Sequence, residues 1–444
     1  MSDISIFNAG MISNPFAVSW FVFTHGGWIF FIFTFLWGFW HMYLVYIRQK
    51  YDNKIQYVIL AIDVPKETEQ TPKAVESVFA HIHGIQSKGD LKKRYLQGYT
   101  QPVISFELIS LGGYIQFVIR TPKDFRDLIE AAFYAQYPDA EITEINDYVT
   151  PYQVIFPNDE YDIYGTELQL TKKDFYPIKT YPSFEHTMTQ QLLDPMASTL
   201  EIMSRLKPGE QFWIQLLISP PDDDSWRERA FRQIKKLVHS TIGEKKKGFV
   251  ENVTWLPSNV ITGLVESFTA DFISPGGEVK KEERQWPTLM QHLTPAERSV
   301  VEGIGIKVSK LFYKTKIRVV YLAEKPVFDK SRVPAIMGAI KQFNTLDMNG
   351  FKVNRKTKTV VVYFRKLARE AWRKKKIMWG YRARSMRRGR STFVLNVEEL
   401  ASLYHFPVIT VKAPLVQKTE MRKGEPPSRL PVEGPQPMQN VTKI

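Results

Sequence analysis

The chain has 444 residues, a formal net charge of +14 at pH 7, and hydrophobic residues at 44% of its positions. With 29 Phe, 20 Tyr and 10 Trp this composition can build folded cores, so the bulk of the chain is not disordered. The absence of cysteine excludes disulfides, Cys-ligated zinc, iron–sulfur clusters and a thiol nucleophile, and it fits a reducing compartment.

The first fifty residues predict a membrane anchor. No Asp, Glu, Lys or Arg occurs from Ile4 to Ile47, and residues 28–47 alone can cross a hydrocarbon core of roughly 30 Å. The start of the chain lacks the cationic segment and small-residue cleavage site of a signal peptide. Because three cations follow within residues 48–54, we expect a single-pass protein of the cytoplasmic membrane with residues 48–444 in the cytoplasm. The anchor side chains expected to contact the lipid bilayer are Trp28, Phe31, Phe33, Phe35, Leu36, Trp40, Tyr43 and Ile47.

Residues 55–150 predict a ferredoxin-like module, with the order strand, helix, strand, strand, helix, strand. Alternating apolar and polar residues around Gly112-Gly113 indicate a hairpin, and Thr71-Pro72 is a typical helix start. The expected elements are strands at 57–64, 103–111, 114–120 and 140–149 and helices at 71–86 and from 121 onward.

Residues 160–364 repeat this order with an insertion at about 220–315. The fold class expected for the whole chain is therefore α+β, with a transmembrane helix followed by two tandem ferredoxin-like (βαββαβ) modules. The insertion should hold helices at 226–239 and 294–310, and Asp222-Asp223-Asp224 reads as a helix start more than as a metal site. The expected strands are 166–170, 211–219, 317–323 and 359–364, and the expected helices begin at 194 and span 331–343.

The segment 365–392 is the strongest functional candidate, because it concentrates the charge in one basic helix. Residues 365–390 hold twelve basic residues and one acid, whereas the rest of the chain is nearly neutral. A nucleic-acid contact, a helix lying on anionic lipid and a structural linker remain open, and the first is favoured. The candidate contacts with nucleic acid or another anionic surface are Arg365, Lys366, Arg369, Arg373, Lys374, Lys375, Lys376, Arg382, Arg384, Arg387, Arg388 and Arg390, and Trp372, Trp379 and Tyr381 are candidates for stacking on bases.

Other chemistry finds little support in the sequence. A phosphate loop cannot be matched, because no Gly-Lys dipeptide occurs. His81 and His83 lie two apart on a predicted helix and point to different faces. We therefore expect no catalytic residue, metal or cofactor. After the basic segment, residues 393–412 predict a short connector with a capping box at Asn396 and Glu399, and residues 413–444 a Pro-rich disordered tail.

Four phrases, at 111–149, 194–215, 314–333 and 393–407, resemble the membrane-anchored N-terminal region of HerA/FtsK-like ATPases. These ATPases are related to the coupling proteins of conjugation and type IV secretion, and the form most resembled comes from candidate-phyla bacteria. The resemblance covers about residues 57–430. In such proteins the region leads into a RecA-type motor, but this chain stops at Ile444, so no nucleotide-binding residue can be carried over.

The resemblance implies a non-catalytic membrane-anchored subunit of a translocation apparatus, on which a separate RecA-type ATPase docks. A homo-oligomeric collar is expected, with the helix at 397–406 and the tail as the docking connector and residues 365–390 touching DNA or the motor. Two alternatives stay open: a membrane-tethered nucleic-acid-binding protein without a motor, and a structural scaffold of an envelope complex.

Overall fold

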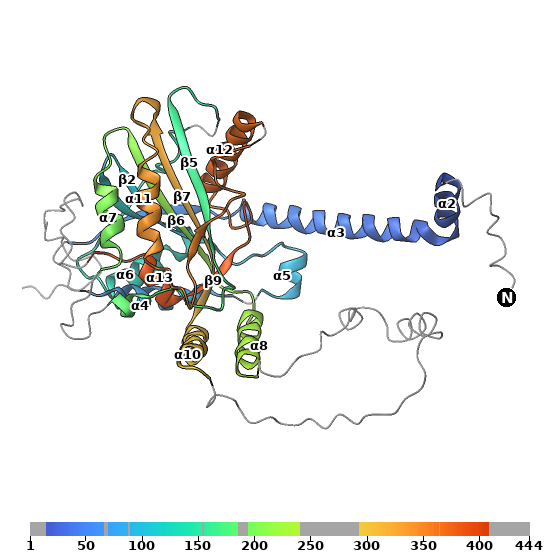
Figure 1. Ribbon diagram of the computed structural model, residues 1–444, viewed down its shortest axis with the longest axis horizontal. Helices are drawn as coiled ribbons and strands as arrows, with labels where there is room; N and C mark the ends of the chain where they lie inside the picture. Colours follow the sequence, from blue (N-terminus) through green and yellow to red (C-terminus); the bar gives the residue numbers. More distant parts are fainter. Residues whose placement is uncertain are drawn as a thin grey trace, which may run out of the picture.

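A computed structural model describes residues 15–65, 70–87, 89–152, 155–184, 194–239, 293–363 and 365–407. The fold is α+β, with one antiparallel sheet and an apolar helix at the N-terminal end (Figure 1). The predicted tail at 413–444 and the middle of the predicted insertion lie outside the described residues.

The described strands form one nine-stranded sheet in the order β4-β1-β3-β2-β6-β7-β5-β8, with β9 paired to β7. Every neighbouring pair is antiparallel. The two halves of the chain meet where β2 pairs with β6 along its full length. The strands are β1 (Tyr57–Asp63), β2 (Ile104–Leu111), β3 (Tyr114–Pro122), β4 (Glu141–Glu144), β5 (Tyr161–Leu170), β6 (Glu210–Ser219), β7 (Phe312–Glu324), β8 (Phe351–Val353) and β9 (Phe393–Asn396).

Helices cover one face of the sheet and bury the main core. Val75, Val78 and Phe79 of α4 are fully buried there, at the i, i+3, i+4 spacing of a single helix face. The elements on this face are α4 (Pro72–Ile82), η3 (His83–Ile85), η4 (Lys123–Phe125), α6 (Arg126–Tyr134), η5 (Tyr181–Phe184), α7 (Ala197–Ser204), η8 (Lys325–Val327), α11 (Arg332–Lys341) and α13 (Val397–Leu403).

The other face carries a smaller core beneath one helix, α12 (Lys366–Arg382). Ile377, Met378 and Tyr381 of α12 pack on Trp213 and Val320 of the sheet. Gly165 on β5 allows this close approach, since a Cβ there would meet Ile377 at 3.0 Å. A helix is present where the basic segment predicts one, and Trp372 and Trp379 lie exposed on it.

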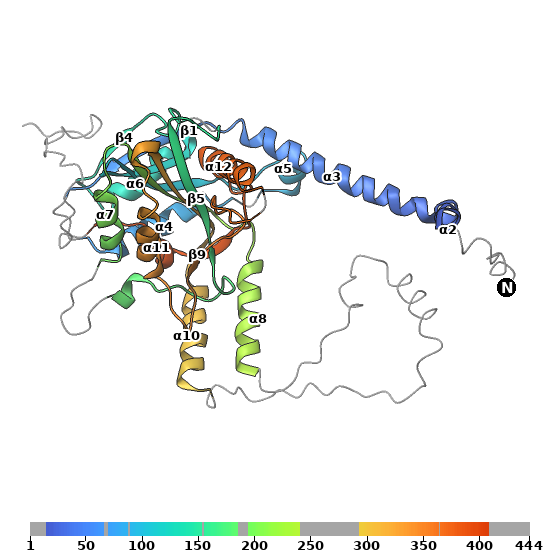
Figure 2. The ribbon, with the colours of Figure 1, turned by 45° about the horizontal axis from the view of Figure 1, so that its top comes forward.

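The insertion contributes α8 (Ser225–His239) and α10 (Pro295–Ser309), which project side by side from one end of the sheet (Figure 2). Both helices lie within a residue of their predicted bounds. A capping box between Thr294 and Glu297 begins α10. Asp223 accepts a hydrogen bond from the Ser225 backbone N–H at 3.2 Å, as expected for a carboxylate at a helix start.

The apolar helix α3 (Trp28–Asp52) extends away from the folded body (Figure 1). It follows α2 (Pro15–Val22) and η2 (Phe23–Gly27), where a positive φ at Gly26 lets the chain change direction. Among the described residues, α3 is the one helix long and apolar enough to cross a membrane. All the predicted anchor side chains lie on it, and Ile47 alone among them is buried, against the body.

One prediction at the C-terminal side is wrong. The last strand is predicted at 359–364, but residues 359–363 do not form it; that place is taken by β8. Thr359 instead exchanges hydrogen bonds with the Gly165 backbone through its own N–H and hydroxyl. The helix predicted as a docking connector is α13, which packs in the main core with Leu400 and Ala401 fully buried. None of the residues of α13 is exposed, with Glu398 and Leu403 half-buried.

Candidate anion-binding groove

A row of buried polar side chains crosses four adjacent strands on the α12 face of the sheet. Glu107 on β2 lies opposite Gln215 on β6, Gln215 opposite Arg318 on β7, and Arg318 opposite Glu167 on β5. Arg318 Nε donates to Glu167 Oε1 at 3.1 Å and its Nη1 donates to Gln215 Oε1 at 3.0 Å. Gln215 Nε2 donates to Glu107 at 2.9 Å, so the row is one continuous chain of contacts.

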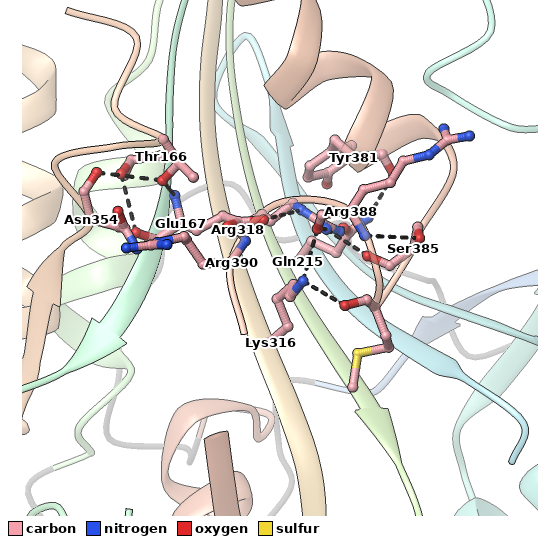
Figure 3. Close-up of polar contacts among 12 residues, drawn as sticks. Thr166, Glu167, Gln215, Lys316, Arg318, Asn354, Tyr381, Ser385, Arg388 and Arg390 are labelled. Carbon is pink, nitrogen blue, oxygen red and sulfur yellow. Dashed lines mark hydrogen bonds and ion pairs between the residues drawn. The ribbon is translucent and has the colours of Figure 1, made fainter. Parts of the chain in front are cut away.

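Two cations of β7 fasten the loop 385–390 to this row (Figure 3). Arg318 Nη2 donates to the carbonyl oxygens of Ser385 and Arg388, at 2.6 and 2.8 Å. Lys316 Nζ donates to the carbonyls of Met386 and Arg388, at 2.6 and 2.8 Å. The loop also needs a glycine at 389, because φ is +91° there and a Cβ would collide with the Glu167 carboxylate. The loop's carbonyls are thus bound toward the sheet.

Arg384 is part of the interior, contrary to its predicted role as a surface contact. Its guanidinium donates to both oxygens of Glu107, at 2.9 and 3.1 Å, and to both oxygens of Asp147, at 2.7 and 3.0 Å. Burial raises the pKa of the Glu107 carboxyl. Arg384 and the other hydrogen-bond donors lower this pKa by a larger amount, so the net shift is downward. The buried Glu107 and the half-buried Asp147 therefore balance the charge of Arg384.

Above this network lies a cavity of about 710 Å³, here called the basic groove. It is bounded by α12, by the turn at 356–357 and by the loop at 388–390, and Glu167 and Arg318 lie at its floor. Its one lining acid, Glu167, is already paired with Arg318. The lining cations are Arg318, Lys356, Arg365, Arg369, Arg373, Lys376, Arg388 and Arg390.

Apart from the buried Arg384, the predicted contact residues divide into three groups. Arg365, Arg369, Arg373, Lys376, Arg388 and Arg390 line the groove. Lys374 and Arg387 point elsewhere and pair with Asp162 and, at 3.2 Å, with Asp52 at the end of α3. Lys366, Lys375 and Arg382 are exposed on α12 but outside the groove. The structure therefore brings half of the twelve predicted cations to one cavity.

The three aromatic candidates also lie in different places. Trp372 lines the groove and is 58% exposed, with Lys376 Nζ 4.5 Å from the centre of its ring. Trp379 is exposed outside the groove, and the Arg388 guanidinium covers its ring at 3.2 Å. Tyr381 is fully buried, with its hydroxyl 2.6 Å from that of Tyr148, so the prediction that it stacks on a base is wrong. Trp372 is the aromatic side chain placed to meet a ligand.

Among the described residues, eight cations and one acid, Glu167, line the groove. Burial and the neighbouring charge of Arg369 both lower the pKa of Arg373, and burial lowers the pKa of Arg388. Such shifts arise where cations are crowded and partly removed from water. A guanidinium group can bind two oxygens of one phosphate through two parallel hydrogen bonds.

Residues 51–419 match the family described as Domain of unknown function (DUF8128). The chain belongs to this family. No curated protein matches it. The DUF8128 match includes the whole sheet, α12 and every residue that lines the groove, but only the last residues of α3.

Sequence reasoning missed two cations of this DUF8128 chain's groove. Arg318 interrupts the apolar run of β7, and a buried strand cation of this kind signals a paired carboxylate on a neighbouring strand. Lys356 lies in a turn nine residues before Arg365, and no pattern in the sequence shows that this turn faces α12. The first signal can be read in a sequence; the second cannot.

Lys316, which holds the loop 385–390, should make stability depend on pH. Burial lowers its pKa from 10.5 to about 8, an effect that Glu167 opposes and Arg318 reinforces. Between these values the unfolded chain binds a proton that the folded chain does not, so the free energy of unfolding should rise with pH from about 8 upward. Replacing Lys316 with Met should remove this rise. Denaturant titrations of both proteins across this range check it, and equal slopes would contradict it.

Proposed function

We propose that this chain is a non-catalytic, membrane-anchored subunit of a type IV secretion- or conjugation-like translocation apparatus, and that its basic groove holds single-stranded nucleic acid. The observation that carries the second part is the groove itself. Eight cations surround a cavity of about 710 Å³, and its one lining acid is neutralised by Arg318. A lipid-binding surface would need neither this concave shape nor a polar floor.

A ligand with several phosphates fits the charge of the groove better than a single anion does. Arg369, Arg373 and Lys376 follow each other at i, i+4 and i+7 on one face of α12, so together they present a line of charge. Trp372 stands on the same wall, where a base could stack while the cations contact the backbone. Charge in a line with an exposed aromatic side chain is the usual arrangement for binding single strands without sequence preference.

The position of the groove supports its use at a membrane. In both views α12 lies near the point where α3 leaves the body (Figures 1 and 2). The loop next to the groove is joined to that point by the ion pair between Arg387 and Asp52. If α3 crosses the cytoplasmic membrane, as its length and composition allow, the groove lies on the membrane-facing side of a cytoplasmic domain.

The resemblance to the pre-motor region of HerA/FtsK-like ATPases supports the remaining part of the proposal, a separate RecA-type ATPase as partner and a homo-oligomeric collar. Because α13 is buried, the ATPase would dock on another surface of the body or on the tail. Affinity purification of the detergent-solubilised full chain from its host, with mass spectrometry, tests this. A stoichiometric ATPase supports it, and recovery of nucleic acid alone favours a tethered binding protein.

We further infer that each half of the sheet is a ferredoxin-like module. The strand order β4-β1-β3-β2 in the first half is the order that two split βαβ units produce, and β8-β5-β7-β6 repeats it in the second half. Joined through β2 and β6, the two modules would carry the polar row, and with it the groove, across their junction.

The binding test uses the purified full chain in nonionic detergent and a fluorescent oligothymidine strand. The affinity should fall steeply as salt rises, because bound cations are released from the phosphates. Vesicles of neutral and of anionic lipid are offered in parallel. Binding to anionic vesicles without binding to the strand would replace nucleic acid by lipid as the ligand, and binding to neither would remove the proposed function of the groove.

The side chain of Trp372 should contribute to this binding. Replacing Trp372 with Ala removes a stacking platform and should weaken oligothymidine binding by about 1 kcal/mol, the low end for a stacked base, because Lys376 already lies over the ring. Trp379→Ala is the matched control on the same helix, since its ring lies outside the groove under Arg388. Equal losses in the two variants would argue against stacking at Trp372.

A further inference from the structure

The short helix α5 (Leu91–Tyr95) combines exposed apolar side chains with positive charge. Leu91 is 70% exposed, Leu96 is 63% exposed and Tyr95 is 42% exposed, although the rest of this half of the molecule has ample core to bury them. Between the two leucines lie three cations at positions 92–94. Exposed Leu and Tyr beside Lys and Arg are the composition of a segment that lies in a membrane interface.

Contacts at four levels fix the segment 91–100 to α3. Tyr95 stacks on Trp40 with ring centres 6.2 Å apart, and Tyr99 meets Tyr51 at 5.6 Å. The Thr100 hydroxyl donates to Asp52 at 2.8 Å. Gly98 has φ +72° and lies so close to the Ile47 carbonyl that a Cβ there would collide with it. The position of α5 along α3 is therefore fixed, and it does not depend on a flexible link.

This position decides the depth of α5 if α3 spans a bilayer. Trp40 lies seven residues before Ile47, the end of the uncharged stretch, which is about 10 Å along a helix axis. A side chain that touches Trp40 must therefore reach below the level where the apolar stretch ends. Interfacial helices lie about 5–10 Å into the boundary between headgroups and acyl chains. The contact between Tyr95 and Trp40 falls at that depth.

We infer that α5 is a second membrane contact: Leu91, Tyr95 and Leu96 enter the cytoplasmic leaflet next to α3, and the exposed Lys92 and Lys93 meet the phosphates of anionic lipids. This inference rests on the proposed membrane anchor and goes beyond it. A single transmembrane helix can rotate about the membrane normal and tilt away from it. A second contact beside α3 restricts both motions, and it holds the groove at a constant distance from the bilayer.

The test measures the depth of single labels in the full chain. Since the chain has no cysteine, a thiol-reactive fluorophore labels only the cysteine that is introduced. Leu91→Cys and Leu96→Cys probe α5. Phe35→Cys probes the middle of α3. Ser198→Cys probes an exposed position on α7, which lies on the side of the body away from α3 in both views (Figures 1 and 2). The proteins are reconstituted in vesicles that contain phosphatidylserine and lipids spin-labelled at a shallow or a deep carbon.

Labels at positions 91 and 96 should be quenched by the shallow spin label, the label at 35 by the deep one, and the label at 198 by neither. The inference is overturned if the labels at 91 and 96 behave like that at 198 while 35 is quenched. It is also overturned if they are protected from a water-soluble quencher without being quenched by lipid, because protein would then cover α5. Loss of quenching at 35 would instead remove the membrane anchor itself, and α5 with it.

Discussion

Replacing Arg384 with Ala should lower the free energy of unfolding by about 3–5 kcal/mol, because it leaves Glu107 buried and charged without its cation. Glu107 is completely buried, and Arg384 binds both of its oxygens. The remaining donors to Glu107, which come from Ser105, Gln215 and Tyr148, are neutral and cannot balance the charge. Guanidinium titration of the full chain in detergent, followed by near-ultraviolet circular dichroism, measures the loss.

Arg382→Ala is the matched control for this prediction. It removes the same charge two residues earlier, but Arg382 is exposed, and the expected change is within about 0.5 kcal/mol. Combining Arg384→Met with Glu107→Met should recover more than half of the lost stability, because neither charge is then left alone in the interior. If Arg384→Ala costs no more than Arg382→Ala, water reaches Glu107 and the network is not buried in solution.

Much of this fold can be predicted from local patterns. Apolar runs, Thr71-Pro72 and the capping boxes at Thr294 and Asn396 each depend on residues within a turn of one another, and the structure has strands or helices at those places. The failure at 359–364 has a physical reason. Val360, Val362 and Tyr363 have strand-like composition, but they lie exposed, and the hydrogen bonds of Thr359 with Gly165 end the pairing.

The candidate site shows where composition stops being informative. The sequence indicated that residues 365–390 were basic, and the groove is lined by six of those twelve cations. It could not tell that Arg384 and Tyr381 turn inward. The partners of Arg384 are Glu107 and Asp147, the partner of Tyr381 is Tyr148, and all three lie more than two hundred residues away. The net charge of a segment shows only how many cations it has. The fold determines which of these cations face solvent.

The basic segment 365–390 has two roles: part of it attaches to the polar row of the sheet, and the rest supplies cations to the groove. The C-terminal half of α12 and the loop after it are fixed to the polar row through Arg318, Lys316 and Arg384. This attachment holds the cations of the groove in place, so a ligand need not order them on binding. Preorganised cations lose less entropy on binding than flexible ones do.

Removing three charges from the groove should have the largest effect on binding. The variant Arg369→Gln, Arg373→Gln, Lys376→Gln keeps polar side chains along one face of α12 but loses its line of charge. Each phosphate contact on a single strand contributes about 0.7 to the slope of log affinity against log salt, so the slope should become shallower by about 2. This corresponds to a roughly 100-fold weaker affinity for oligothymidine near 0.1 M salt, and the difference should nearly vanish near 1 M salt.

The matched control removes the same net charge from the opposite face of the sheet, with Lys73→Gln, Lys123→Gln and Lys341→Gln. These exposed lysines lie on α4, η4 and α11, which cover the main core and not the groove. If nucleic acid is held by the net charge of the chain alone, both triple variants lose affinity equally. If the groove holds it, the control keeps nearly the wild-type slope, because charges farther away than a Debye length, about 10 Å at 0.1 M, are largely screened. The salt dependence of the two variants therefore separates a built site from a generally basic surface.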